Sequence, residues 1–344
     1  MEKIRKLFQK SVSIIGIGTY VPTSSFTSDD IEERIHSQSQ YHDFQKGIVY
    51  DISGTYTRHF VAPDEQASTV AIYASKKAIE SARLNINDID CIIFASASQD
   101  IIEPATANMV QLGLGSTAPV MDIKNACNSF LNGIQVASSM IQSGQYKNIL
   151  VCSGETPSRA IKWNTKDRKE FKDALAGYSL GDAGVAMILS EKKKNMPTVV
   201  FTEFYSKGEY CYTSTILGGG SLYPRDAEKN YFLSDSKALS EAFGLHAKEF
   251  CLVSLHKYGW KISSIQYFFP HIVSRYSANI FRDVFSIAHH HIINYNSTHG
   301  NMASCSIPYA LVRAIEEKKF APGQRGLMIG LGAGASFGVV GIQF

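Results

Sequence analysis

The chain has 344 residues, of which 44% are hydrophobic and 19% charged, and its formal net charge is +3. This composition is typical of a globular protein with one large domain or two fused ones. The lysines and arginines are dispersed, so they form no patch for a nucleic acid. No stretch approaches the roughly 18 apolar residues of a membrane span, and residues 1–6 lack the apolar core of a signal peptide, so we expect a cytoplasmic protein without membrane insertion.

Strands and helices alternate through the first half of the chain. An apolar run at 11–22 predicts a strand, and residues 27–33 predict a capped helix start. Residues 36–57 are polar and have no clear period, which indicates a long surface loop or lid. The remaining elements of this half are helices at 69–84 and 105–112 and strands at 89–95, 118–123, 148–152 and 181–189. Such alternation predicts a parallel sheet with both faces covered.

The second half has a similar order of elements, although no repeat is visible in the letters of the sequence. Its elements are strands at 198–204, 265–269, 326–331 and 336–343 and helices at 236–258, 274–285 and 302–317. We therefore expect an α/β protein with two duplicated halves, residues 1–195 and residues 196–344.

Cys127 stands between an apolar strand and a helix. Small and apolar residues recur at helical spacing from Phe130 to Ile141, and Gly144 follows the helix. The unpaired amides at a helix start favour a thiolate, so this position predicts a lowered thiol pKa and a nucleophilic cysteine. The structural alternative is a small buried side chain without chemistry, as most free cysteines are.

Two later polar residues lie at comparable junctions. His271 follows a predicted strand, and Asn301 precedes a predicted helix. Taken alone, these positions favour a structural histidine and a helix-capping asparagine. Together with Cys127 they provide a thiol, a base and an amide donor, which is a set that nucleophilic catalysis uses.

The other cysteines, at 91, 152, 211, 251 and 305, form no Cys-x-x-Cys pair and no zinc spacing. The run His289-His-His291 has no carboxylate pattern nearby, which favours surface or packing residues over metal ligands. We therefore expect a reduced protein without a metal site.

Five stretches of the chain resemble motifs of the 3-oxoacyl-ACP synthase III branch of the thiolase-fold condensing enzymes. They occur in the family's order, and the spacing from His271 to Asn301, 301 − 271 = 30 residues, also matches. The stretches are Asp122-Ile-Lys-Asn-Ala-Cys127, Gly181-Asp-Ala-Gly184, Phe269-Pro-His271, Gly300-Asn301 and Gly332-Ala-Gly-Ala-Ser-Phe-Gly338. The resemblance implies two fused α/β halves in a five-layer thiolase-like fold, a homodimer, and an active site between the halves.

The resemblance also implies roles for individual residues. Cys127 would carry the acyl group, and His271 and Asn301 would hydrogen-bond the carbonyl of the second thioester as it becomes an enolate. The backbone amides of Cys127 and Gly334 would form the oxyanion hole for acyl transfer. Arg168 would bind substrate, because its segment is similar to one on the nucleotide side of coenzyme A in the family.

Glu103, directly before Pro104, departs from the synthase III pattern. Synthase III enzymes tend to have an aromatic residue here, on a loop that reaches the partner subunit's acyl pocket. With Asn125-Ala-Cys127 and Leu131-Asn-Gly133, this glutamate resembles the head-to-head condensing enzymes of olefin synthesis, which join two acyl thioesters without decarboxylation and use a glutamate base. Two further departures are Ile-Val-Ser-Arg after His271 and a stretch at 36–57 without tryptophan.

The sequence thus predicts an acyl-thioester condensing enzyme of synthase III type, an acyltransferase that acts on acyl-CoA or acyl-ACP without a further cofactor. Its expected partners are a second copy of the chain and an acyl carrier protein, and no nucleic acid. Two alternatives stay open. In the first, the enzyme passes the acyl group from the cysteine to a hydroxyl or amine of a natural product. In the second, the protein is a non-catalytic paralogue that binds an acyl-carrier partner.

Overall fold

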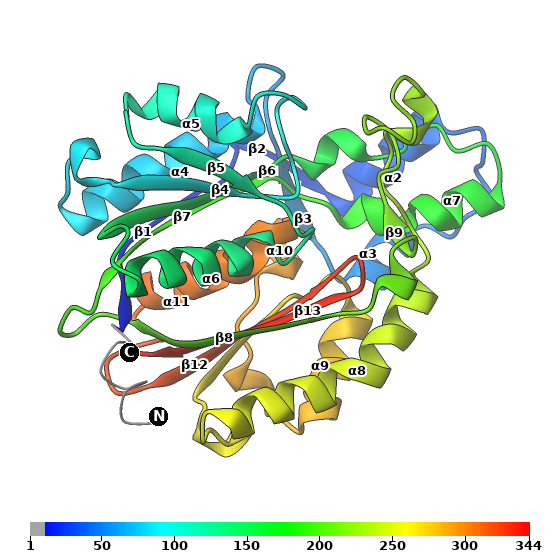
Figure 1. Ribbon diagram of the computed structural model, residues 1–344. Helices are drawn as coiled ribbons and strands as arrows, with labels where there is room; N and C mark the ends of the chain where they lie inside the picture. The colour runs from blue at the N-terminus through cyan, green and yellow to red at the C-terminus, as the bar shows by residue number, and fades with distance from the viewer. Residues whose placement is uncertain (1–10) are drawn as a thin grey trace.

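The computed structural model describes residues 11–344, so the expectation for residues 1–6 lies outside its range. The chain folds into five layers in the order helices, sheet, helices, sheet, helices (Figure 1). The first sheet consists of β1 (Val12–Tyr20), β7 (Ala183–Glu191), β6 (Asn148–Glu155), β4 (Cys91–Ala95) and β5 (Val120–Ile123). The second consists of β8 (Thr198–Ser206), β13 (Ser336–Gln343), β12 (Arg325–Gly332) and β11 (Tyr267–Pro270).

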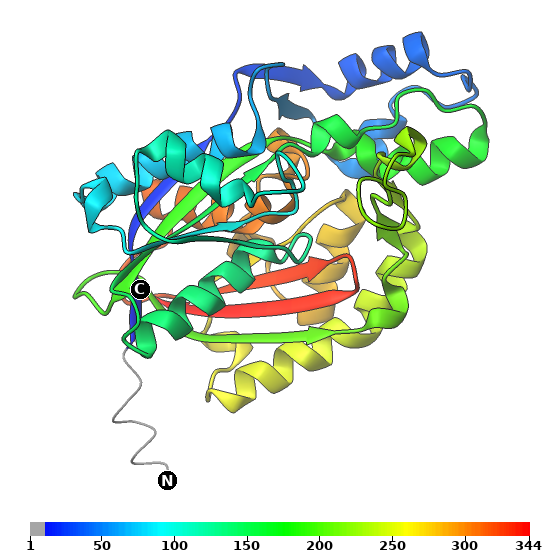
Figure 2. The same cartoon turned by 45° about the horizontal axis from the view of Figure 1, so that its top comes forward.

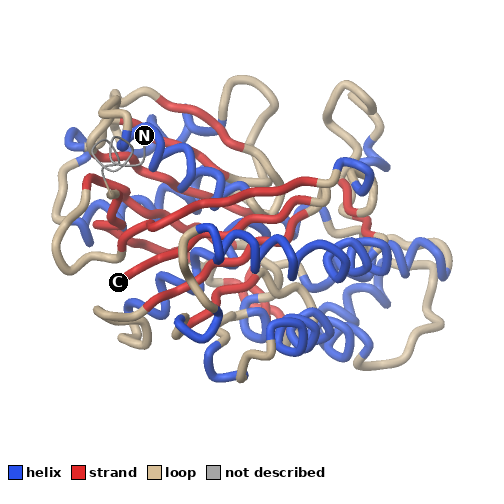
Figure 3. The backbone as a smooth tube through the Cα atoms, turned by 60° about the horizontal axis from the view of Figure 1, so that its bottom comes forward, coloured by secondary structure: helices blue, strands red, loops and turns tan. Residues whose placement is uncertain are grey.

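The helices cover both faces of each sheet, as the alternation of elements predicts (Figure 3). The outer helices are α4 (Ala67–Ala82) and α5 (Thr106–Leu114) on the first sheet and α8 (Ser236–Lys257) and α9 (Arg275–Phe285) on the second. The middle layer contains α6 (Ser129–Gln142) and α11 (Ser306–Glu316). No helix in the part of the chain that the structure describes combines the length and the apolar character that a membrane crossing requires.

The sheets are mixed, so the prediction of a parallel sheet is wrong in part. β4 pairs with β5 and β6 in parallel, and β11 pairs with β12 in parallel, whereas β1–β7, β6–β7, β12–β13 and β8–β13 are antiparallel. A parallel pair needs a crossover of a dozen or more residues, but residues 333–335 alone separate β12 from β13. A connection this short makes a hairpin.

Residues 36–57 are more ordered than the sequence predicts. The capped helix start at 27–33 is confirmed, because Thr27 Oγ1 accepts a hydrogen bond from Asp30 N at 3.1 Å at the start of α2 (Ser28–Gln38). A second helix, α3 (Ile48–Ser53), follows, and the buried Glu32 carboxylate accepts from Gly47 N and Val49 N at 2.8 and 2.9 Å. A helix of six residues is too short to give a period, so the sequence suggested only a loop.

Smaller elements extend the molecule beside the five layers. They are β2 (Ser24–Thr27), β3 (Thr57–Phe60), α7 (Arg168–Ala174), β9 (Ser214–Thr215), β10 (Leu233–Ser234) and α10 (Asn296–His299).

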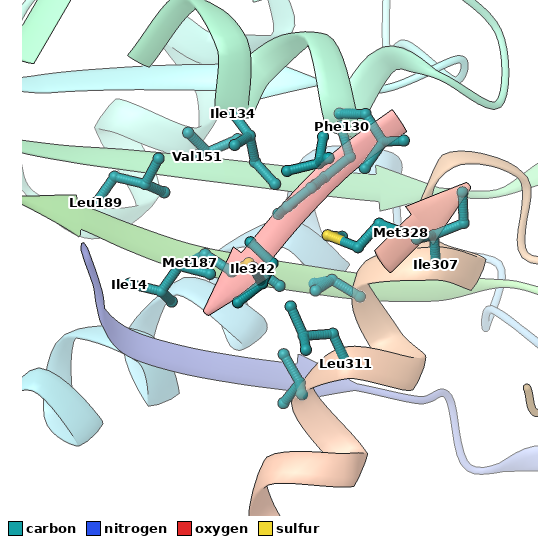
Figure 4. Close-up of a cluster of buried hydrophobic side chains, with 14 of the residues drawn as sticks. Ile14, Phe130, Ile134, Val151, Met187, Leu189, Ile307, Leu311, Met328 and Ile342 are labelled. Atoms are coloured by element: carbon teal, nitrogen blue, oxygen red, sulfur yellow. The ribbon is translucent and has the colours of Figure 1, made fainter. Parts of the chain in front are cut away.

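The core lies in the middle layer, where α6 and α11 meet both sheets. Figure 4 shows Phe130 and Ile134 of α6 and Leu311 of α11 among side chains of the two sheets, such as Val151 and Met328. In contrast, the pairing of β1 with β8, which joins the two sheets into one order of nine strands, is short and consists of Val12 with Val199 and Ser13 with Thr198. Side-chain packing in the middle layer therefore holds the two halves together.

This arrangement predicts a large loss of stability for truncation in α6. Leu131 is 0% exposed and Leu245 on α8 is 68% exposed. Leu131→Ala is expected to lower the free energy of unfolding by about 2–5 kcal/mol, because it leaves a cavity in the core. Leu245→Ala, the matched control, is expected to change it by less than about 0.5 kcal/mol. Urea denaturation measures both values, and equal losses would contradict the packing described.

Candidate active site

Cys127 lies on a tight turn between β5 and α6. Asn125 N donates to Ser129 Oγ at 2.8 Å, and Ser129 Oγ donates to Ala126 O at 2.7 Å, so the turn is fixed by its own hydrogen bonds. Ala126 has a φ of 47°, a left-handed conformation that is unfavourable for any residue with a side chain. The turn presents Cys127 two residues before the first residue of α6, with Asn128 in the cap position, so Cys127 lies just before a helix start as the sequence predicts.

The β12–β13 hairpin packs directly against this turn, and α6 crosses the hairpin in Figure 2. A Cβ on Gly330 would collide with Asn128 Oδ1, so the close approach requires glycine there, and a Cβ on Gly332 would stand 3.5 Å from Cys127 N, in ordinary contact. Asn128 Nδ2 also donates to Ser336 Oγ at 2.9 Å. These contacts bring the hairpin turn that contains Gly334 to Cys127.

The turn with Gly334 is fixed from a second side as well. Ala335 N donates to Lys207 O, and Lys207 N donates to Ala335 O, both at 2.8 Å. Gly334 has a φ of 133°, in the range that favours glycine. The backbone of this turn is therefore held by β8 and by Asn128 together.

His271 follows β11, which is parallel to β12, so it lies at the end of the second sheet where the turn with Gly334 follows β12. Its backbone N donates to Ile329 O on β12 at 2.9 Å, beside Gly330, which contacts Asn128. The side chain is 5% exposed, and neither ring nitrogen has a hydrogen-bond partner among residues 11–344. Burial lowers the pKa of His271 to about 4, so the imidazole is neutral at pH 7. A buried imidazole with two free nitrogens is suited to bind a ligand.

Asn301 lies between the two halves. Its N donates to Ser179 O at 2.8 Å, and its O accepts from Gly181 N at 3.1 Å. The side-chain Oδ1 accepts from Ala303 N at 3.0 Å, so Nδ2 is the donor group that the amide offers. The helix-cap alternative for Asn301 is wrong, because α11 begins at Ser306 with Cys305 in the cap position.

The electrostatic prediction for Cys127 is also wrong. Burial, and then the negative charge of Glu155, raise the pKa of the Cys127 thiol to about 12, while a backbone hydrogen bond lowers it by less. The sequence shows the helix start, but it does not show that β6 places the Glu155 carboxylate where its charge acts on the thiol. Cys127, whose side chain is partly buried, is therefore a thiol at neutral pH.

Glu155 is the residue that the sequence analysis missed. It ends β6 and is 0% exposed, with its carboxylate held by backbone amides and serine hydroxyls. The only signal in the sequence is an acidic residue three positions after the apolar strand at 148–152.

The structure does not bring Glu103 and Arg168 to Cys127 within one chain. Glu103 is exposed on the loop before α5, beside the exposed Ile101 and Ile102. Arg168 is exposed as the first residue of α7.

An aromatic contact near α7 was not predicted either. The guanidinium of Arg34 lies 4.1 Å from the ring centroid of Trp163. Trp163 lies in the segment before α7, outside residues 36–57.

Comparison with known proteins gives matches over nearly the whole chain. The model of the 3-oxoacyl-[acyl-carrier-protein (ACP)] synthase III family matches residues 121–208, and the model of the family's C-terminal part matches residues 255–344. The beta-ketoacyl-[acyl-carrier-protein] synthase III of Neisseria gonorrhoeae is 29% identical over 340 residues, covering 96% of this chain and 98% of that protein. The corresponding protein of Desulfitobacterium hafniense is 28% identical, covering 97% and 98%.

Solved structures of OleA from Xanthomonas campestris have the same fold. Cerulenin-bound OleA superposes with a TM-score of 0.89 and 26% identity, covering 98% of each chain. A cysteine-to-serine OleA variant with bound lauric acid and lauroyl-CoA also gives 0.89 and 26%, covering 98% of this chain and 100% of that one. Other matching OleA structures carry substitutions of a glutamate or a histidine.

The five layers and the cysteine at the start of a buried central helix define a thiolase-fold condensing enzyme. Within that class the chain belongs to the 3-oxoacyl-ACP synthase III-like branch, with its solved structural relatives among the OleA enzymes. It is an acyltransferase that condenses acyl thioesters through a cysteine.

The raised thiol pKa predicts slow alkylation of Cys127 in the absence of substrate. Iodoacetamide reacts with the thiolate, so at pH 7 the exposed Cys211 is expected to react faster than Cys127. The rate at Cys127 should keep rising as the pH is raised to 10. Peptide mass spectrometry after timed alkylation measures both residues. Faster labelling of Cys127 at pH 7 would mean that the helix start outweighs burial and Glu155.

Proposed function

We propose that Cys127, His271 and Asn301 carry out a two-step condensation of two acyl thioesters. The observation that carries the proposal is the unpartnered, buried imidazole of His271 at the strand ends that contact the Cys127 turn. In the first step Cys127 Sγ attacks the thioester carbonyl, and the amides of Cys127 and Gly334 stabilise the oxygen of the tetrahedral intermediate. The thiol of the carrier leaves with one proton, and the acyl group stays on Cys127.

In the second step the donors are His271 and Asn301. The carbonyl of the second thioester gains negative charge as its α-carbon becomes an enolate, and a neutral imidazole N–H and Asn301 Nδ2 stabilise that charge. The enolate carbon attacks the acyl carbonyl on Cys127, a carbon–carbon bond forms, and the thiolate of Cys127 is released. The two halves, residues 1–195 with Cys127 and residues 196–344 with His271 and Asn301, thus contribute to one site.

Intact-mass spectrometry after mixing with an acyl-CoA tests the first step. Wild-type protein is expected to gain the mass of one acyl group, and Cys127→Ala is expected to gain none, because the nucleophile is absent. Cys251→Ala is the matched control, since Cys251 is buried on α8 away from the site and should leave the adduct unchanged. An acyl adduct on Cys127→Ala would refute the assignment.

We propose that the acyl carrier is coenzyme A and that Arg168 contacts its nucleotide. Arg168 is exposed, and Trp163, which is close to it in sequence and contacts the Arg34 guanidinium, provides a flat aromatic surface for a purine base. An OleA structure with bound lauroyl-CoA supports this choice over an acyl carrier protein.

We further propose that the enzyme is a homodimer and that Glu103 serves the partner's Cys127. The edge strand β5 has half-buried side chains and unpaired backbone groups, which suit pairing with a second copy. The loop with Glu103 is linked to β5, because Thr106 N and Ala107 N both donate to the Asp122 carboxylate at 2.8 Å.

In that position Glu103 would remove an α-proton from the second acyl thioester. A decarboxylating enzyme needs no such base, because loss of carbon dioxide itself generates the enolate. The proposed reaction is therefore a condensation without decarboxylation.

Acyl-CoA supplied alone tests the role of Glu103. Wild-type protein is expected to release free coenzyme A and a condensed product. Glu103→Gln should still form the acyl adduct, but its condensation rate should be roughly 10²-fold lower, as expected for loss of a general base. Glu209→Gln, a change at another glutamate, should have no effect. A wild type that condenses only malonyl substrates, or a fully active Glu103→Gln variant, would remove Glu103 from the mechanism.

A further inference from the structure

Glu155 is a buried carboxylate that the steps above do not use. Its hydrogen-bond donors among residues 11–344 are amides and hydroxyls, with no lysine or arginine. Ala97 N donates to Oε1 at 2.7 Å, and Ser98 N and Ser98 Oγ donate to Oε2 at 3.0 and 2.7 Å. Burial of a carboxylate without a cation is costly, so a role beyond packing is expected of it.

Ser304 links Glu155 to Asn301. Ser304 N donates to Glu155 Oε1 at 3.3 Å, and Ser304 Oγ donates to the same oxygen. The preceding residue, Ala303, donates its amide to Asn301 Oδ1 at 3.0 Å. Glu155 therefore fixes the short turn that holds the oxygen of the Asn301 amide, and with it the direction of Nδ2.

We propose that Glu155 is a positioning residue for the condensation step. Through Ser304 it orients the amide of Asn301 toward the second thioester. The proposal rests on the proposed role of Asn301.

The effect on Asn301 is tested by condensation on enzyme that already carries the acyl group. Ser304→Ala and Glu155→Gln are expected to take up the acyl group on Cys127 as wild type does, while condensation by Ser304→Ala falls about tenfold from loss of the hydrogen bond. Wild-type condensation by both Ser304→Ala and Glu155→Gln would overturn the positioning effect. Asn301→Ala distinguishes a failure of the link to Glu155 from a failure of the proposed function of Asn301. If this variant also condenses normally, the proposed function of Asn301 is wrong, and if it alone is slow, only the link to Glu155 is wrong.

Discussion

The burial of α6 between two sheets is the constraint on which the site depends. A helix with apolar side chains on most of its surface is stable only when both sides are covered, and residues such as Phe130 and Ile134 meet strands of both halves. Its N-terminal turn then lies inside the protein, where it meets a glycine hairpin of the second half. The proposed site, with Cys127 from one half and His271 from the other, follows from the position of this helix.

The electrostatics of the site follow from the same burial. His271 is neutral because a charged imidazole would lose its hydration, and Cys127 is a thiol because a thiolate would lose its hydration beside Glu155. A site of neutral groups and fixed amides suits a reaction in which negative charge appears on carbonyl oxygens only during the chemical steps. Donors already in place then cost no reorganisation.

The sequence predicts local features well, and it fails where distant segments meet. The Thr27 cap, the helix after Cys127 and the covered sheets all follow from short patterns, and the family resemblance supplied the class of enzyme. The lowered thiol pKa was wrong because burial of the thiol, and after it the charge of Glu155, depend on how segments distant in the sequence pack together. The mixed sheet was missed for a similar reason, since apolar alternation does not encode strand direction. The roles of Glu103 and Arg168 depend on molecules outside one chain, so neither the sequence nor the fold of a single chain determines them.

The pairing of β1 with β8 that joins the two sheets is short, so the cohesion of the halves comes from apolar side chains in the middle layer. Apolar burial has a characteristic thermodynamic signature, which is a large heat-capacity increment on exposure and a stabilisation that weakens on cooling. Ladder hydrogen bonds within each sheet do not have this temperature dependence to the same degree. The joint between the two sheets consequently weakens on cooling, as apolar packing does.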